Sequence, residues 1–461
     1  MSGMRLLAVI ICWLAIIAVP AVDTPAPAGP PFVDGDVVAV IGDSITHDGR
    51  WHRYVADFYA TRYPGRLVRF VNCGIAGDTA AGVLKRLDSD ILPNHPTAAV
   101  VMLGMNDVGR GAYGTAAPAA AQTTEFREKF LTSYRANLTE LVMRLRQAGI
   151  KRIVLVTPSP FDQTAKLASD PLTGVNDALG RCAQIAQEVA QQNGCGVVDF
   201  HAPMTALNLA RQQQDPAFTL IGNDRVHPAA PGHLVMAWLF LQAQGVSPLV
   251  SRVVLDASTT AVAEQVNAQV GGMVWKDGVT FTLTQQALPL PLNPDTLPAL
   301  QWVPLAATID REELAISHLP AGTYQLSIDA AEVGRFAAAQ FADGIDLACN
   351  PKTPQFRQAQ GLLTVANDLR TAELPLRNVA LVDEKWLPAL GPVPAEPDQR
   401  LNAAVAKAAG SEAWKKKIAD DYRATKPDMA AAHLRIDALV KRLYEAAQPK
   451  PHTYLVKRVA E

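Results

Sequence analysis

A carboxylate and a histidine stand three residues apart in the segment Asp224-Arg225-Val226-His227-Pro228. In so tight a segment Asp224 can accept a hydrogen bond from one imidazole nitrogen of His227, which leaves the other nitrogen facing outward. A serine hydroxyl is a poor nucleophile at neutral pH, and a base held in this way activates it. The segment therefore predicts nucleophilic catalysis by a serine, with His227 as the general base.

The candidate nucleophile is Ser44, in the segment Gly42-Asp43-Ser44-Ile45-Thr46 that follows the apolar run Val37–Ile41. A serine just beyond the carboxyl end of a parallel strand lies where α/β sheets build their active sites. The segment lacks the Gly-x-Ser-x-Gly elbow, which disfavours the α/β-hydrolases. Taken alone, Gly-Asp-Ser is also a common turn sequence, so its meaning depends on the segments that accompany it.

Two further segments follow apolar runs in the same way. The first is Asn72-Cys73-Gly74-Ile75-Ala76-Gly77-Asp78-Thr79, and the second is Leu103-Gly104-Met105-Asn106-Asp107. Taken singly, the glycines can form a tight turn and the asparagine is common in turns. The four segments, however, occur in order at the ends of successive predicted strands.

Together the four segments closely resemble the motifs of the SGNH (GDSL-like) hydrolases, over roughly Val37 to Gln244. The resemblance implies that Ser44 is the nucleophile, that His227 is the base, and that Asp224 holds the imidazole tautomer. It also implies an oxyanion hole that is formed by three donors. These donors are the backbone N–H groups of Ser44 and Gly77 and the side-chain amide of Asn106.

Other polar residues of the motifs are expected to have structural roles. Asp43 and Asp107 should shape loops by bonding to nearby backbone. Ala76 occupies a position where this family often has a serine before the oxyanion glycine. The remaining histidines are expected in packing, in capping or at the surface; they include His47, His52, His95, His201 and His233.

The elements that position these residues follow from hydrophobic periodicity. Five short runs are apolar on both faces, as in a parallel sheet that helices cover: Val37–Ile41, Leu67–Val71, Ala98–Leu103, Ile153–Val156 and Gly196–Asp199. Amphipathic helices are predicted between them: Trp51–Tyr63, Ala80–Leu92, Thr124–Gln147 (with Thr124 as cap) and Asn176–Asn193. The alternation predicts an α/β fold, a three-layer α/β/α domain with a parallel sheet over residues 36–245.

The pattern changes beyond Gly245. Alternating stretches such as 279–283 and 323–328 predict a smaller β-containing accessory region over residues 246–385. Residues 386–461 are expected to form a Pro-rich spacer, 387–398, followed by C-terminal helices. Helical patterns are predicted at 356–374, 403–407 and 411–448.

The N-terminus has the layout of a secretory signal peptide, with Arg5 before an apolar run and small residues ahead of a cleavage site after Ala21. Residues 1–21 are therefore expected to be removed, and residues 22–35 form a Pro/Ala-rich leader. We expect a secreted or periplasmic protein with no stable membrane span after cleavage. The remaining cysteines are expected to be buried free thiols, although export would permit one disulfide: Cys73, Cys182, Cys195 and Cys349.

The charge balance and the motifs reduce the range of functions that the sequence could have. The 42 Lys and Arg nearly balance the 44 Asp and Glu, which excludes a nucleic-acid partner bound through a basic face. No motif for a metal or a cofactor is present, so none is expected. The prediction is a secreted serine esterase that forms an acyl-serine intermediate and acts on a small-molecule or polysaccharide ester.

The substrate is expected to be a short-acyl (acetyl) ester of a carbohydrate, because no run of large aliphatic residues adjoins the motifs. Arg50 and Arg110 would then face a hydroxylated leaving group. Two alternatives remain open. One is a lysophospholipase or thioesterase with a longer acyl preference, and the other is a non-catalytic glycan-binding protein on a hydrolase scaffold.

Overall fold

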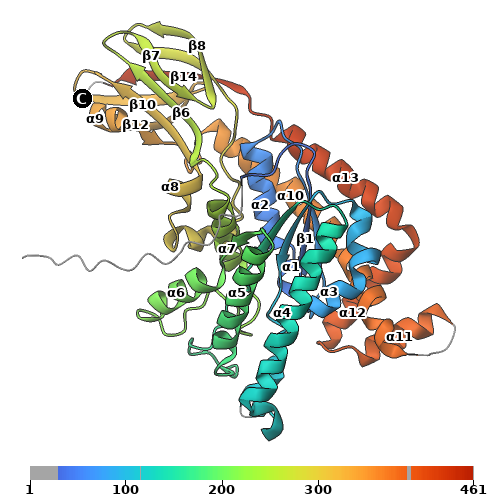
Figure 1. Cartoon of the computed structure of the whole chain (residues 1–461). Helices are drawn as coiled ribbons and strands as arrows, with labels where there is room; N and C mark the ends of the chain where they lie inside the picture. The colour runs from blue at the N-terminus through green and yellow to red at the C-terminus, as the bar shows by residue number, and fades with distance from the viewer. Residues whose placement is uncertain (1–29, 115, 392–395, 460–461) are drawn as a thin grey trace, which may run out of the picture.

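A five-stranded parallel sheet forms the centre of the molecule, in the strand order β2-β1-β3-β4-β5 (Figure 1). The computed structural model describes residues 30–114, 116–391 and 396–459. The predicted signal peptide, most of the leader and the middle of the spacer lie outside the described residues. The strands are β1 (Val37–Gly42), β2 (Arg69–Gly74), β3 (Ala98–Met102), β4 (Arg152–Val156) and β5 (Gly196–Val198).

Helices cover both faces of this sheet, which confirms the predicted three-layer α/β/α fold. One face carries α2 (Arg50–Arg62) and α7 (Ala230–Ala243), which pack against each other. The other face carries α3 (Ala80–Arg86), α4 (Thr124–Gln147) and α5 (Val175–Gln192). Every residue of β3 is buried, as expected for a central strand that is covered on both sides.

Local capping hydrogen bonds and turns fix the ends of the helices, and some boundaries differ from the predicted ones. Helix α4 is capped by Thr123 rather than Thr124, since the Thr123 hydroxyl accepts the N–H of Phe126 at 3.2 Å. Helix α3 ends at Arg86, and the predicted remainder becomes a π turn (Leu87–Ile91) and a 3₁₀ turn (Leu92–Asn94). The sequence analysis missed α6 (His201–Gln212), which follows β5.

Two smaller sheets form the accessory region at one end of the molecule (Figure 1). The first has the order β13-β10-β6-β7, and the second has the order β12-β11-β14-β9-β8. Strands β6 and β10 are parallel, and the other pairs are antiparallel. The strands are β6 (Leu249–Asp256), β7 (Ala261–Val266), β8 (Ala268–Trp275), β9 (Gly278–Gln285), β10 (Arg311–Ser317), β11 (Thr323–Ile328), β12 (Ala331–Ala337), β13 (Ile345–Asp346) and β14 (Pro451–Arg458).

Strand β14 was not predicted, because the C-terminal region was expected to be helical to its end. It lies between β9 and β11, so the last described residues complete a sheet begun nearly two hundred residues earlier. Tyr454 and Val456 point into the core with no exposed surface, whereas the intervening Leu455 is 38% exposed. This period-two alternation is a strand signal, but it covers too few residues to stand out beside a long helix.

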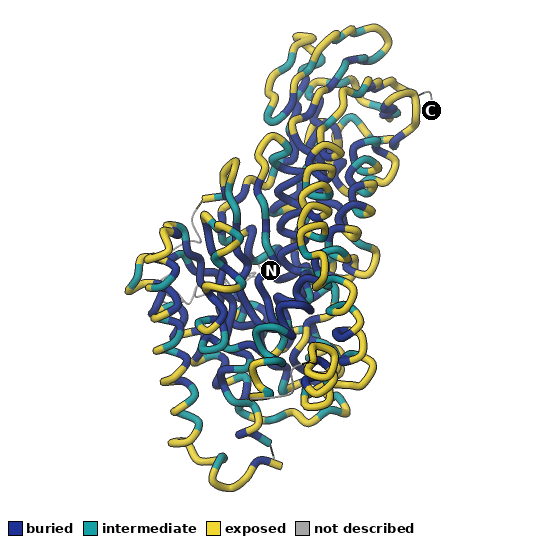
Figure 2. The backbone as a smooth tube through the Cα atoms, turned by 90° about the vertical axis from the view of Figure 1, so that its right-hand side faces the viewer, coloured by how far each residue is buried: buried dark blue, intermediate teal, exposed yellow. Residues whose placement is uncertain are grey.

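The C-terminal helices pack against the α/β/α domain rather than extending away from it. Helix α10 (Pro354–Leu381) contacts α2 and β2 on one side and α12 and α13 on the other. Much of α10 is buried, and the outer helices carry the exposed surface (Figure 2). The predicted helix 411–448 is divided into α12 (Glu412–Thr425) and α13 (Met429–Ala446) by a turn that contains Pro427; α11 (Pro397–Lys407) precedes them.

Two further expectations concern cysteines and membrane spans. The four cysteines of the described residues are free thiols; Cys73, Cys182 and Cys195 are buried, but Cys349 is exposed, contrary to the prediction. None of the helices within residues 30–114, 116–391 and 396–459 is long and apolar enough to cross a membrane.

Candidate active site

Ser44 is the first residue of the short helix α1 (Ser44–His47), which begins directly after β1. The turn before it is tight: a Cβ on Gly42 would come within 2.9 Å of the Met102 carbonyl oxygen, so only glycine fits without a shift. The Asp43 carboxylate accepts the N–H of Ile45 at 3.0 Å and caps the helix. Asp43 thus shapes this loop, as expected.

The structure brings Ser44, His227 and Asp224 into one hydrogen-bonded chain. Ser44 Oγ lies 2.7 Å from Nε2 of His227, across 183 residues of sequence. Nδ1 of His227 lies 2.5 Å from Oδ2 of Asp224. The other carboxylate oxygen, Oδ1, accepts the backbone N–H groups of Val226 and His227, each at 3.0 Å. Because these bonds fix the carboxylate, Nδ1 of His227 carries the proton and Nε2 is left to accept from the serine.

The pKa values of His227 and Asp224 suit proton transfer from Ser44. The hydrogen bond to Asp224 raises the pKa of His227 above its ordinary value, against the opposing effect of burial. Partial burial would raise the pKa of Asp224, but the hydrogen bonds from His227 and Val226 outweigh it and hold that pKa well below its ordinary value. Asp224 therefore stays ionised at neutral pH and favours an imidazolium at His227.

The predicted oxyanion donors lie in the same cavity as Ser44 and His227. Gly77 has φ +71°, a conformation that disfavours other residues, and its N–H has no hydrogen-bond acceptor within the described part of the chain. One N–H of the Asn106 amide donates to the Asp78 carbonyl at 2.9 Å. The amide has a second N–H, which is left for another acceptor. Asp107 shapes the adjoining loop, because its Oδ1 accepts the Ala80 N–H at 2.9 Å.

The cavity around these residues has a volume of about 930 Å³, and the C-terminal helices form part of its wall. Arg50 and Arg110 both line it, where they could face a leaving group. The residues that sequence reasoning missed come from α10, from α12 and from the loop before α12: Arg370, Leu374, Asn378, Ala409, Gly410, Ser411, Trp414, Lys417 and Ile418. Three of them, Leu374, Trp414 and Ile418, supply the large apolar groups that are missing next to the motifs.

Ion pairs join this wall to the residue that follows the helix of Ser44. The Asp48 carboxylate, one residue beyond α1, accepts from Arg50 at 3.2 Å and from Arg370 of α10 at 3.2 Å. Arg370 also donates to the Asp48 carbonyl at 2.8 Å. The C-terminal helix is therefore joined to the catalytic edge of the sheet by direct polar contacts.

His47 has a more specific place than the packing, capping or surface role expected for it. Its Nδ1 accepts the Ala76 N–H at 3.2 Å, and its Nε2–H donates to Oδ1 of Asn378 at 3.0 Å. Burial lowers the pKa of His47 to about 4, so the ring is neutral and this tautomer is maintained. Nδ2 of Asn378 in turn donates to Asp421 at 2.6 Å. His47 therefore joins the loop that contains Gly77 to α10 and, through Asn378, to α12.

Comparisons with known proteins extend these observations. Residues 40–235 match the model of the GDSL-like lipase/acylhydrolase family. A gut microbial diltiazem-metabolizing enzyme of known structure is 31% identical, with a TM-score of 0.86, over 94% of this chain and 100% of its own. An acetylxylan esterase from Geobacillus stearothermophilus is 29% identical over 228 residues, which are 46% of this chain and 94% of the esterase. A crystal structure of an acetylxylan esterase from that organism is 25% identical over 48% of this chain and 97% of its own, with a TM-score of 0.38.

One of these matches covers the four motifs, and another covers nearly the whole chain. The region that matches the family model contains all four motifs, from Ser44 to His227. The similarity to the gut microbial enzyme also runs through the accessory sheets and the C-terminal helices, since it covers 94% of this chain. The resemblance to the SGNH hydrolases is thereby confirmed. Residues 40–235 form a domain of the GDSL-like lipase/acylhydrolase family, and the chain is a carboxylic-ester hydrolase.

Proposed function

We propose that this chain is an exported serine esterase that removes short acyl groups, acetyl above all, from carbohydrates. The observation that carries the proposal is the hydrogen-bonded chain from Ser44 through His227 to Asp224 at the wall of an open cavity. A serine joined to an oriented imidazole in this way is equipped for acyl transfer. The signal-peptide pattern of residues 1–21 supports export.

The reaction begins when Ser44 Oγ attacks the ester carbonyl carbon and His227 Nε2 takes the hydroxyl proton. Negative charge then develops on the carbonyl oxygen, where the N–H groups of Ser44 and Gly77 and the Asn106 amide can donate to it. Each such donor commonly contributes about 3 kcal/mol to transition-state stabilisation. The Asp224 carboxylate stabilises the imidazolium without taking its proton.

Collapse of the tetrahedral intermediate breaks the bond to the leaving oxygen, and His227 gives its proton to that alcohol. The acyl group then remains on Ser44 Oγ. In the second half, water attacks the acyl carbon while His227 takes a proton from it, and return of that proton to Ser44 releases the carboxylic acid. Bonds and protons balance over the cycle, and the enzyme is regenerated.

The carbohydrate leaving group is supported by the cavity and by similarity. Arg50 and Arg110 supply hydrogen-bond donors at the cavity wall, and Trp414 supplies an aromatic surface. Polar donors beside an aromatic ring suit a sugar, which has hydroxyls at its rim and C–H groups on its faces. The 29% identity to an acetylxylan esterase supports the same substrate class.

A second candidate is hydrolysis of longer acyl esters, and the wall formed by the C-terminal helices favours it. Leu374, Trp414 and Ile418 could contact an acyl chain, which would gain about 0.8 kcal/mol for each buried methylene. The two candidates differ in which part of the substrate touches these side chains.

The test measures kcat/KM for p-nitrophenyl esters from acetate to decanoate, together with acetate release from acetylated xylo-oligosaccharides. Proposed specificity for acetylated carbohydrates requires a maximum at acetate and Ser44-dependent release of acetate from the oligosaccharides. A maximum at octanoate or beyond would favour the second candidate. No hydrolysis of any ester would contradict both candidates and support the glycan-binding alternative.

A further inference from the structure

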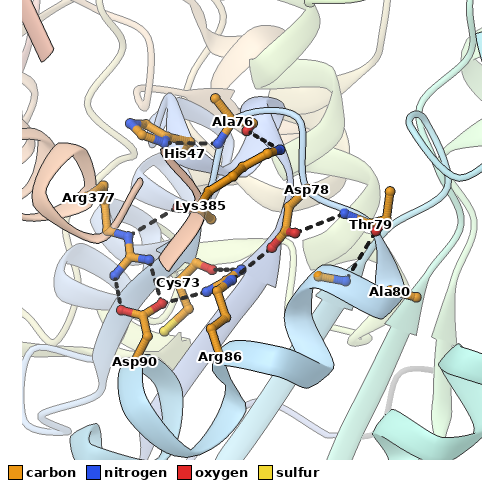
Figure 3. A network of polar contacts seen from close by, with 12 residues as sticks. His47, Cys73, Ala76, Asp78, Thr79, Ala80, Arg86, Asp90, Arg377 and Lys385 are labelled. Carbon is orange, nitrogen blue, oxygen red and sulfur yellow. Dashed lines mark hydrogen bonds and ion pairs between the residues drawn. The ribbon is translucent and has the colours of Figure 1, made fainter. Parts of the chain in front are cut away.

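A lysine from the C-terminal region contacts the loop of the oxyanion glycine. Lys385 lies in the π turn Val382–Trp386 that continues α10, and its Nζ donates to the Ala76 carbonyl at 3.0 Å (Figure 3). The two residues are 309 positions apart in sequence. Lys385 forms no ion pair with a carboxylate in the described part of the chain. The bond to Ala76 is the one side-chain hydrogen bond that Lys385 makes among the described residues.

The acceptor of this hydrogen bond belongs to the peptide group that would serve the reaction. The Ala76 carbonyl and the Gly77 N–H are the two ends of one peptide unit. A cation that binds the carbonyl oxygen draws electron density from the peptide, and the N–H at the other end becomes a stronger donor. Lys385 therefore acts on the same dipole that would point at the developing oxyanion.

Gly77 and Lys385 also fit each other sterically. A Cβ on Gly77 would come within 2.8 Å of Lys385 Nζ, which real Cβ atoms essentially never do. The φ of +71° favours glycine here, whereas the lysine end could move aside from a side chain because it is flexible. The close approach places the ammonium beside the oxyanion hole.

The rest of the loop is held by one arginine from α10 and another from α3. Arg377 of α10 donates to the Gly74 carbonyl at 3.1 Å and to both oxygens of Asp90 at 2.8 and 2.7 Å. Arg86 of α3 joins Asp90 at 2.5 Å and Asp78 at 2.8 Å (Figure 3). The loop is therefore anchored at Gly74 and Asp78, and Lys385 is the contact made at the oxyanion peptide itself.

We propose that Lys385 is a positioning residue of the oxyanion hole, which fixes the Ala76–Gly77 peptide and polarises the Gly77 N–H toward the transition-state charge. The inference rests on the proposed function, because Gly77 is assigned as an oxyanion donor there. It gives the C-terminal region a part in catalysis although that region lies outside the four motifs.

The surroundings of the ammonium support this role. Burial lowers the pKa of Lys385 below its ordinary value, and the nearby Asp78 and Asp43 carboxylates oppose that shift while Arg86 adds to it. A partly desolvated charge is screened less than one in bulk water, so it acts more strongly on a neighbouring peptide.

The test compares Lys385→Met with Lys385→Arg and with the wild type on p-nitrophenyl acetate. Loss of one oxyanion donor lowers kcat by about 10²–10³-fold, so weakening one donor should lower it by about 10- to 100-fold. We expect KM to stay within about twofold, because the effect acts on the transition state. Lys385→Arg keeps the cation and should retain most of the wild-type kcat.

A second readout does not depend on turnover. A p-nitrophenyl alkylphosphonate reacts when Ser44 Oγ bonds to phosphorus, p-nitrophenolate leaves and His227 takes the serine proton. Its phosphoryl oxygen then occupies the oxyanion hole. The rate of phosphonylation should fall in Lys385→Met by about the same factor as kcat.

Lys407 offers a matched control. It also donates to a backbone carbonyl of this region, that of Ala389 at 2.6 Å, but it is exposed. Lys407→Met should leave kcat, KM and Tm unchanged. If Lys385→Met does not fold, Lys385→Gln, which keeps an N–H donor without the charge, is measured with the same expectation.

The outcomes separate this inference from the proposed function. If Ser44→Ala keeps the esterase activity, the proposed function fails and the inference fails with it. If Ser44→Ala is inactive but a folded Lys385→Met keeps kcat within about threefold, only the inference is overturned. It is overturned as well if kcat falls only in proportion to a loss of folded protein, with no recovery in Lys385→Arg.

Discussion

Nε2 of His47 lies 3.0 Å from Oδ1 of Asn378, so the helix that begins with the candidate nucleophile is joined to a helix 331 residues later. Through the same ring the oxyanion loop is held at Ala76. The catalytic edge of the α/β domain and the C-terminal helices are therefore one structural unit.

The first prediction concerns the nucleophile and the base. Ser44→Ala and His227→Ala should each lower kcat/KM for p-nitrophenyl acetate by at least about a thousandfold, because the two residues act as a unit. Asp224→Ala should be less damaging, since Asp224 orients and stabilises without taking the proton. Circular dichroism serves as the control for folding. More than a few per cent of wild-type activity in Ser44→Ala would refute the assignment.

The second prediction concerns pH. Attack requires neutral His227, so kcat/KM should be low under acidic conditions and should rise as the imidazolium loses its proton. The hydrogen bond to Asp224 raises the pKa of His227, which places the midpoint above the ordinary value of 6.5. In Asp224→Asn the midpoint should move to lower pH, because the anionic partner is lost. A profile that is flat from pH 5 to 9 would contradict a His227-limited step.

The third prediction concerns the contact between His47 and Asn378. Asn378→Ala leaves the buried Nε2–H of His47 without its acceptor, which should lower the free energy of unfolding by about 1–3 kcal/mol. It should also lower kcat, because His47 holds the Ala76 N–H. Asn367→Ala, an exposed position on the same helix, should change stability by less than about 0.5 kcal/mol. Denaturant titration of both variants makes the comparison, and equal stabilities would count against the contact.

The fourth prediction concerns β14. The Tyr454 ring has no exposed surface and stacks on Phe281 with 5.1 Å between ring centroids. Tyr454→Ala should therefore lower the free energy of unfolding by about 3–5 kcal/mol. Leu455→Ala, on the exposed face of the same strand, should have little effect. If the two variants lose comparable free energies of unfolding, the side chains of β14 do not alternate between buried and exposed in this way.

Much of the catalytic edge could be predicted, because its signals are local. A run that is apolar on both faces marks a central parallel strand, and the residues after it must lie at the carboxyl edge of the sheet. Ser44 was found in this way, whereas the roles of Gly77 and Asn106 were implied by the resemblance to the SGNH hydrolases. The three-residue spacing of Asp224 and His227 is likewise a relation within one turn.

Other parts of the site depend on contacts between distant residues, which no hydrophobic pattern in the sequence indicates. Nothing near Lys385 in the sequence indicates that it reaches Ala76, and nothing near His47 indicates Asn378, because the partners are brought together only when α10 packs on the sheet. Leu374, Trp414 and Ile418 reach the cavity for the same reason.

The sequence by itself determined the α/β/α domain, its family and the placing of motif residues after successive strands, whereas the strand order β2-β1-β3-β4-β5 was decided by the tertiary structure. The tertiary structure decided that the C-terminal helices form part of the cavity wall and that β14 completes a sheet of the accessory region. The physical reason is that the hydrophobic pattern of a segment shows which of its faces is buried. Which distant element covers that face is decided by packing complementarity between surfaces, and the local sequence does not encode that partner.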